Sequence, residues 1–107
     1  RLTHLDFAGG QLTMARQSIA VGSPVRLRIA ARDVSLTLRR QSGTSILNIL
    51  PVTVDEISLD DDAQVTVRVL AQDVPLLARI TRKSALELGL QPGLEVFAQV
   101  KGIALLN

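Results

Sequence analysis

The sequence predicts an all-β domain, a small barrel of about seven short strands with one short α-helix. Apolar and polar residues alternate along most of the chain, turn signals separate the alternating segments, and only one segment has helical spacing. The length of 107 residues suits one domain with a modest core. Hydrophobic residues make up 47% of the chain and are almost all aliphatic, which excludes a disordered chain.

The first part of the chain predicts a hairpin and two strands. Residues 2–15 predict the hairpin, because Gly9 and Gly10 supply the positive φ angles that a tight turn needs. Residues 25–32 and 34–40 alternate as strands do. In the first of these, one face carries a row of three arginines, namely Arg26, Arg28 and Arg32.

The second part predicts further strands over residues 52–59, 64–71, 74–80 and 95–101. The apolar residues of the first of these strands change phase, which predicts a β-bulge near Asp55 and Glu56. Between the last two strands, Thr81 is a good helix N-cap and Gly89 suits the residue after the helix. In the last strand we expect Val96, Ala98 and Val100 to face inward, and Phe97, Gln99 and Lys101 to face outward.

Composition excludes several kinds of chemistry. There is no cysteine, so a thiolate zinc site and a cysteine nucleophile are excluded, and His4 is the single histidine. The chain contains no phosphate-binding loop and no nucleophile elbow, so the sequence predicts no catalytic residue and no enzyme activity of its own. We interpret residues 60–62, three aspartates, as a solvated loop, because calcium loops need ligands at spaced positions.

Charge is unevenly distributed, at +5 over residues 1–40 and −3 over residues 41–107. A basic front half could meet an acidic surface, including a neighbouring domain of the same protein. Small barrels also bind single-stranded nucleic acid through aromatic platforms, but only Phe7 and Phe97 are aromatic here. We therefore expect no nucleic-acid partner, and keep a nucleic-acid-binding barrel as the least favoured alternative.

The segment "TSILNILP" (residues 44–51) sets small hydrogen-bonding side chains at the start of an apolar run. Two interpretations stay open. Thr44, Ser45 and Asn48 could donate to an oxyanion, which needs several convergent donors. Alternatively, Thr44 and Ser45 satisfy backbone groups at a strand start while Ile46 and Leu47 pack at a contact between subunits.

Three segments in order, "TSILNILP", "LLARITRKSALELGLQPG" and "VFAQVKGIAL", resemble the molybdate-binding Mop (molbindin-like) domain. This domain occurs in the C-terminal TOBE region of the ModC family, the ATP-binding subunits of bacterial molybdate ABC transporters. The resemblance covers about residues 25–107 well, and the first 24 residues match less specifically. It implies an OB-like barrel with extra N-terminal strands beside it.

The resemblance also implies a setting for the chain. We expect one TOBE/Mop-like domain over residues 1–107, with N-terminal strands in residues 1–40 and the Mop-like core in residues 41–107. The chain begins without an initiator methionine, so we expect a piece of a longer protein whose ABC ATPase domain lies outside it. The implied partners are a second copy, that ATPase domain and the membrane permease subunit. The implied location is cytoplasmic, peripheral to the inner membrane.

In ligand-binding members of this family, an oxyanion sits between subunits. Its donors come from a "SARN"-like segment and from a lysine followed by small or hydroxyl residues. Ser45 and Asn48 match the first and last positions of that segment, and Lys101 matches the lysine. Leu47 stands where many binders have arginine, and Gly102, Ile103 and Ala104 follow Lys101, where a serine is often expected.

The resemblance predicts a regulatory and dimerisation domain that binds molybdate or tungstate through Thr44, Ser45, Asn48 and Lys101, with no covalently bound cofactor. The parent protein would be an ATPase. The competing hypothesis is a purely structural module that joins two subunits and binds no ligand.

Overall fold

The computed structural model describes residues 2–106. Its regular structure consists mostly of antiparallel strands, which confirms the predicted all-β class. The strands are β1 (Leu2–Phe7), β2 (Gly10–Ala15), β3 (Leu27–Arg28), β4 (Val34–Thr37), β5 (Asn48–Leu59), β6 (Gln64–Ala71), β7 (Val74–Thr81), β8 (Glu95–Val100) and β9 (Ala104–Leu105). The helices are a 3₁₀ turn, η1 (Ala31–Asp33), and one α-helix, α1 (Arg82–Leu88).

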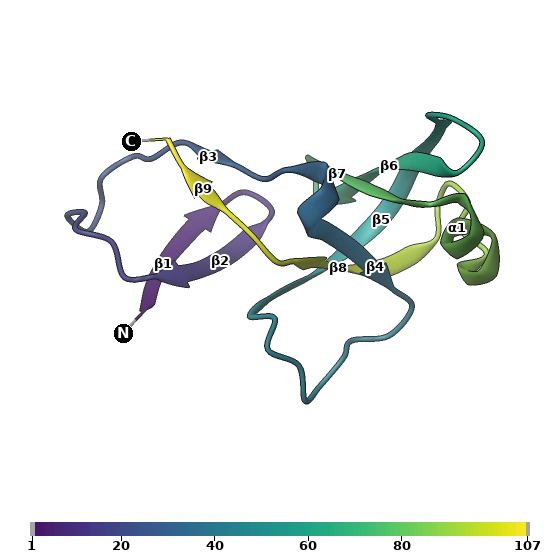
Figure 1. The fold of residues 1–107 in the computed structure, drawn as a ribbon. Helices are drawn as coiled ribbons and strands as arrows, with labels where there is room; N and C mark the ends of the chain where they lie inside the picture. Colours follow the sequence, from purple (N-terminus) through teal and green to yellow (C-terminus); the bar gives the residue numbers. More distant parts are fainter. Residues whose placement is uncertain (1, 107) are drawn as a thin grey trace.

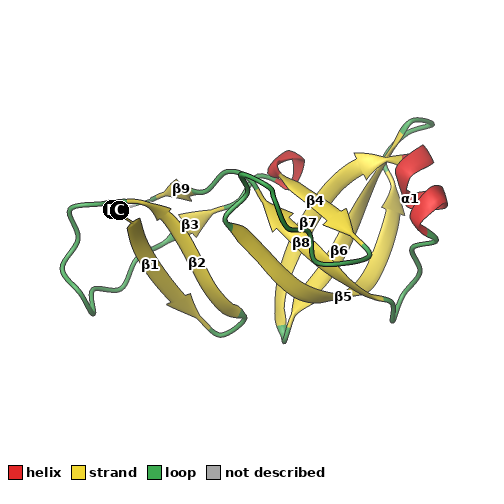
Figure 2. Cartoon of the chain, turned by 90° about the horizontal axis from the view of Figure 1, so that it is seen from below, coloured by secondary structure: helices red, strands yellow, loops and turns green. Residues whose placement is uncertain are grey.

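Five strands form a curled sheet in the order β4-β8-β5-β6-β7. Figure 2 shows this sheet wrapping around itself until its two edge strands, β4 and β7, approach each other. These edges are in contact but do not share a hydrogen-bonded ladder, so the barrel is a half-barrel. The sheet includes β4, which lies within the predicted N-terminal part, residues 1–40.

Strand alternation builds the barrel core as the sequence predicts. Val67 and Val69 on β6, and Ala98 on β8, are completely buried. The β5–β6 register shifts between Val54 and Glu56, which confirms the predicted bulge. Pairing continues on both sides of the shift, so β5 bends without losing its partner.

The helix ends are also as predicted. The Thr81 hydroxyl oxygen accepts a hydrogen bond from the Ser84 N–H, and Gly89 follows the helix in the left-handed conformation, with a φ of 66°. These two residues limit α1 to a short segment between β7 and β8.

The remaining strands extend from one end of the barrel, as Figure 1 shows, and give the molecule extents of 44 × 27 × 22 Å. β1 and β2 form a hairpin, and β3 pairs with β9. Gly10 has a positive φ of 141°, as predicted, but Gly9 has not. Gly9 is required for space, because a Cβ there would lie 2.7 Å from the Ala71 carbonyl oxygen of the barrel.

Asn48 fastens this hairpin to the barrel. Its Oδ1 accepts a hydrogen bond of 2.7 Å from the Thr13 N–H, and its Nδ2 donates one of 2.8 Å to the Thr13 carbonyl oxygen. The residue is only 7% exposed. The carboxamide therefore acts on β2 as a neighbouring strand would, pairing both main-chain groups of one residue.

Two predicted strands are shorter than expected. The segment 25–32 is extended only over Leu27–Arg28, because η1 begins at Ala31 and turns the chain toward β4. Arg32 lies on η1, so the predicted row of three arginines on one strand is wrong. The segment 34–40 leaves the sheet after Thr37 and enters a long loop.

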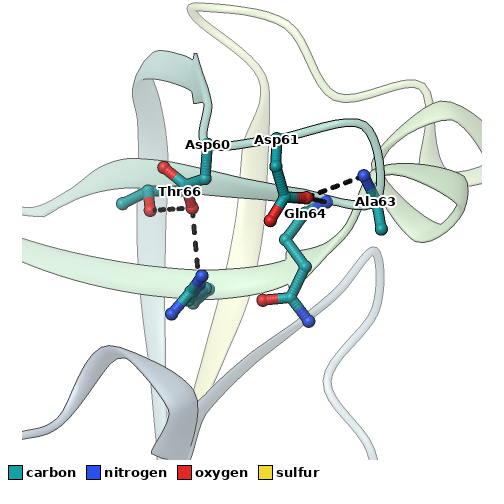
Figure 3. Close-up of polar contacts among 6 residues, drawn as sticks. Asp60, Asp61, Ala63, Gln64 and Thr66 are labelled. Carbon is teal, nitrogen blue, oxygen red and sulfur yellow. Dashed lines mark hydrogen bonds and ion pairs between the residues drawn. The ribbon is translucent and has the colours of Figure 1, made fainter.

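Residues 60–62 form the polar loop that the sequence predicts, as Figure 3 shows for Asp60 and Asp61. Asp60 accepts a hydrogen bond of 2.7 Å from the Thr66 hydroxyl and forms an ion pair with Arg79 at 3.4 Å. Asp61 accepts hydrogen bonds from the N–H groups of Ala63 and Gln64 at 2.8 and 2.9 Å. Within residues 2–106, no group of three or more acidic or histidine side chains could hold a metal ion.

Replacing Asn48 by alanine should leave the N–H and the carbonyl of Thr13 without partners. We expect a loss of about 1–3 kcal/mol in the free energy of unfolding, because a part-buried backbone group without a partner is costly. Urea unfolding measures this loss, and amide exchange locates it. The Thr13 amide should exchange faster, and unchanged protection of that amide would contradict the role of Asn48.

The Asp61 loop should contribute to acid sensitivity. The N–H of Ala63, and then that of Gln64, hold the pKa of the Asp61 carboxyl below its ordinary value of 3.8. The folded state therefore binds this proton less readily than the unfolded state does. The resulting stabilisation is complete above a pH of about 3.8, the ordinary pKa of this carboxyl. It is lost as the pH falls through the lower pKa of the folded state.

Asp61→Asn keeps an acceptor oxygen but does not titrate. Urea unfolding over a pH series should show a shallower loss of stability below pH 3.8 in this variant than in the original chain. Equal slopes in the two proteins would show that Asp61 does not carry this effect.

Candidate oxyanion site

The two segments predicted to bind an oxyanion meet at the end of β8. Val100 pairs with Val34 of β4 on one side and with Asn48 of β5 on the other. The Lys101 N–H donates to the Asp33 carbonyl oxygen at 2.8 Å, which extends the β4–β8 ladder by one residue. Lys101 thus leaves the sheet beside the point where residues 44–48 enter it.

The predicted neutral donors differ in their availability. Thr44 and Ser45 lie exposed in the loop before β5. The Thr44 hydroxyl oxygen accepts a hydrogen bond of 3.1 Å from the Ile46 N–H, so it satisfies a backbone group as the packing interpretation expects. Asn48 is engaged with Thr13, which leaves one of its amide hydrogens for another acceptor.

Lys101 is the cation that the sequence predicts for this site. Its side chain is exposed, and within residues 2–106 it has no carboxylate within ion-pair distance. A carboxylate lies near its neighbour, however, because a Cβ at Gly102 would be 3.1 Å from Asp33 Oδ2. A side chain at position 102 would crowd this carboxylate.

Apolar side chains remain exposed on the same segments. Leu47 is 62% exposed, and Leu38, at the start of the loop that leads to it, is 47% exposed. Ile46 between them is half-buried. An arginine in place of Leu47 would have room to extend into solvent.

Gln99 is a polar residue of this region whose environment differs from the prediction. We expected it to face outward like Phe97 and Lys101, but it is only 8% exposed. It pairs with Ser35 of β4 on one side and with Ile49 of β5 on the other, and these neighbours cover it. Phe97 is half-buried, with the guanidinium carbon of Arg40 5.2 Å from its ring centroid.

Ser35 fixes the orientation of the Gln99 side chain, because its hydroxyl donates to Gln99 Oε1 at 3.1 Å. Only the cross-strand pairing brings Ser35 and Gln99 together, since they lie 64 residues apart. The local sequence pattern therefore gave no signal for this polar pair.

No helix within the described part of the chain has the length and apolar character needed to cross a membrane.

The chain is similar along its length to parts of known proteins. The Molybdenum import ATP-binding protein ModC of Albidiferax ferrireducens is 55% identical over 106 residues, which are 99% of this chain and 29% of that protein. The ModC proteins of Aromatoleum aromaticum and Methylococcus capsulatus are 48% and 47% identical, again over 99% of this chain, and over 28% and 30% of their own lengths. The chain thus spans about three tenths of these relatives.

A solved structure supports the same relationship. The cytoplasmic molybdate-binding protein ModG, in a crystal form with molybdate bound, has a TM-score of 0.81 to this chain at 25% identity. The match covers 92% of this chain and 77% of the other, and it confirms the predicted OB-like fold. The family model of the TOBE domain matches residues 44–105, more than half of the sequence. The chain therefore belongs to the TOBE domain family, as its resemblance to that region of ModC predicted.

Proposed function

We propose that this chain is the C-terminal regulatory and dimerisation domain of a molybdate import ATP-binding protein. In this proposal it pairs with a second copy of itself and binds molybdate or tungstate where the two copies meet. Binding biases the ATPase domain of the same protein, which acts with a membrane permease subunit. The whole protein would lie in the cytoplasm, peripheral to the inner membrane.

One observation carries the ligand part of the proposal. The pairing of Asn48 with Val100 brings the end of the segment 44–48 beside Lys101, a cation without an ion-pair partner in residues 2–106. Molybdate is a dianion with four acceptor oxygens, and it needs convergent donors with at least one charge-assisted bond. Ser45 and Thr44 add exposed hydroxyl groups on the loop that leads to Asn48.

The structural alternative keeps its own support. Leu38 and Leu47 expose apolar surface on the loop that leads into β5. Apolar side chains at this place suit a contact with a second copy, since their burial is favourable without any ligand. In that case the same surface would join two subunits and bind nothing small.

Native mass spectrometry of the chain, with and without molybdate, separates these functions. A dimer that gains oxyanion mass supports the full proposal, whereas a dimer that gains none supports the structural module. A chain that stays monomeric at high concentration and gains no mass would overturn both.

Lys101→Met should weaken molybdate binding by roughly ten- to a hundred-fold, because it removes a charge-assisted hydrogen bond. Titration calorimetry measures the change. Lys83 is the matched control, since it is the only other lysine and pairs with Glu87 on α1 at 3.7 Å. Equal losses in Lys101→Met and Lys83→Met would point to general electrostatics instead of a site.

Leu47→Arg should strengthen binding. It restores the cation that many ligand-binding members have at this position, and the exposed Leu47 leaves space for it. We expect a gain of roughly ten-fold or more, from one added charge-assisted hydrogen bond. The control is Leu86→Arg on α1, where the leucine is 71% exposed and the net charge changes equally. A gain in both variants would show that charge alone is responsible.

A further inference from the structure

Gln99 presents an amide nitrogen that the fold does not use. Its Oε1 accepts from Ser35, but its Nε2 makes no hydrogen bond within residues 2–106. In the same part of the chain, no fully buried side-chain nitrogen or oxygen lacks a partner. The Nε2 atom must therefore reach the surface, although the residue as a whole is 92% covered.

The outer face of β8 places this nitrogen on the same side as Lys101. Side chains two residues apart on a strand point to the same face, and Val100 between them points into the core, where it is 1% exposed. Lys101 continues the β4–β8 ladder through its bond to Asp33, so the alternation extends to it. The face therefore carries a fixed neutral donor and a flexible cation in succession.

We propose that Gln99 Nε2 is a binding donor for the oxyanion at Lys101, held in place by the Ser35 hydroxyl. This inference rests on the proposed function and adds to its donor set. It supplies a hydrogen-bond donor where few others are available, because most of the Asn48 carboxamide bonds to Thr13 and Leu47 has no donor. A tetrahedral dianion with the size and charge of molybdate or tungstate could accept from both Gln99 and Lys101.

The rigidity of Gln99 gives this donor a physical advantage. Its carboxamide is fixed by Ser35 and enclosed between β4 and β5, so little side-chain freedom remains to be lost on binding. The low exposure also reduces competition from water for the N–H groups. Lys101, which is exposed and carries its charge on a long flexible stem, would contribute charge more than geometry.

The test combines a near-isosteric variant with a direct readout. Gln99→Met removes the amide but keeps the size and the unbranched shape of the side chain. Molybdate titration should show affinity reduced by roughly ten-fold, the effect of one hydrogen bond to a charged acceptor. Gln91→Met is the matched control, because Gln91 is exposed and its side chain makes no hydrogen bond within the described residues.

Nuclear magnetic resonance of the side-chain amides gives the second readout on the unaltered chain. The Gln99 NH₂ pair is identified as the pair missing from the Gln99→Met spectrum, or by direct assignment if that variant does not fold. We expect this pair to shift when molybdate is added and the Gln91 pair to stay in place. An unmoved Gln99 pair in a chain that binds molybdate overturns the inference.

The outcomes also separate this inference from the function on which it rests. If Lys101→Met weakens binding while Gln99→Met binds normally, the proposed function stands and the Gln99 donor is wrong. If the unaltered chain binds no molybdate at all, the proposed ligand function fails and the Gln99 inference fails with it.

Discussion

The structure depends on the position of β8 between β4 and β5. Val100, for example, pairs with Val34 on one side and with Asn48 on the other, and these residues lie 66 and 52 positions away in the sequence. Without β8, β4 would have no ladder, and β5 would have a partner only in β6. Such distant pairings cost more chain entropy than a hairpin does, so the buried side of β8 must be strongly favourable. Its inward residues, Val96, Ala98 and Val100, are all at most 2% exposed.

The same strand creates the candidate site on its other face. A strand buried on one side must present its alternate residues on the opposite side, which here are Phe97, Gln99 and then Lys101 beyond its end. Each has a different neighbour: Arg40 lies over Phe97, Ser35 holds Gln99, and Lys101 is exposed. Polarity therefore increases toward the end of β8, and the exposed Lys101 lies where the segment 44–48 enters the sheet.

Local patterns were sufficient for the barrel and insufficient for the contacts around the site. Alternation predicted the buried faces of β6 and β8, and the phase change predicted the bulge in β5. Cap residues predicted both ends of α1 because capping depends on neighbours within one turn. The Asn48–Thr13 pair and the Ser35–Gln99 pair were missed, since each joins residues far apart in the sequence. Arg32 was misplaced because nothing in the alternation of residues 25–32 signals the turn at Ala31.

Charge balance connects the two parts of the proposed function, oxyanion binding and dimerisation. At the end of β8, one chain offers a single lysine, Lys101, and the carboxylate of Asp33 lies against the adjacent Gly102. A dianion placed there by one copy would keep most of its charge uncompensated, and burying an uncompensated charge is strongly unfavourable. In the proposed dimer, a second copy would bring a second Lys101, and surfaces such as Leu47 would exclude water. Oxyanion binding and pairing of the two copies should therefore be coupled. The free energy by which a bound oxyanion stabilises the dimer equals the free energy by which dimer formation strengthens oxyanion binding.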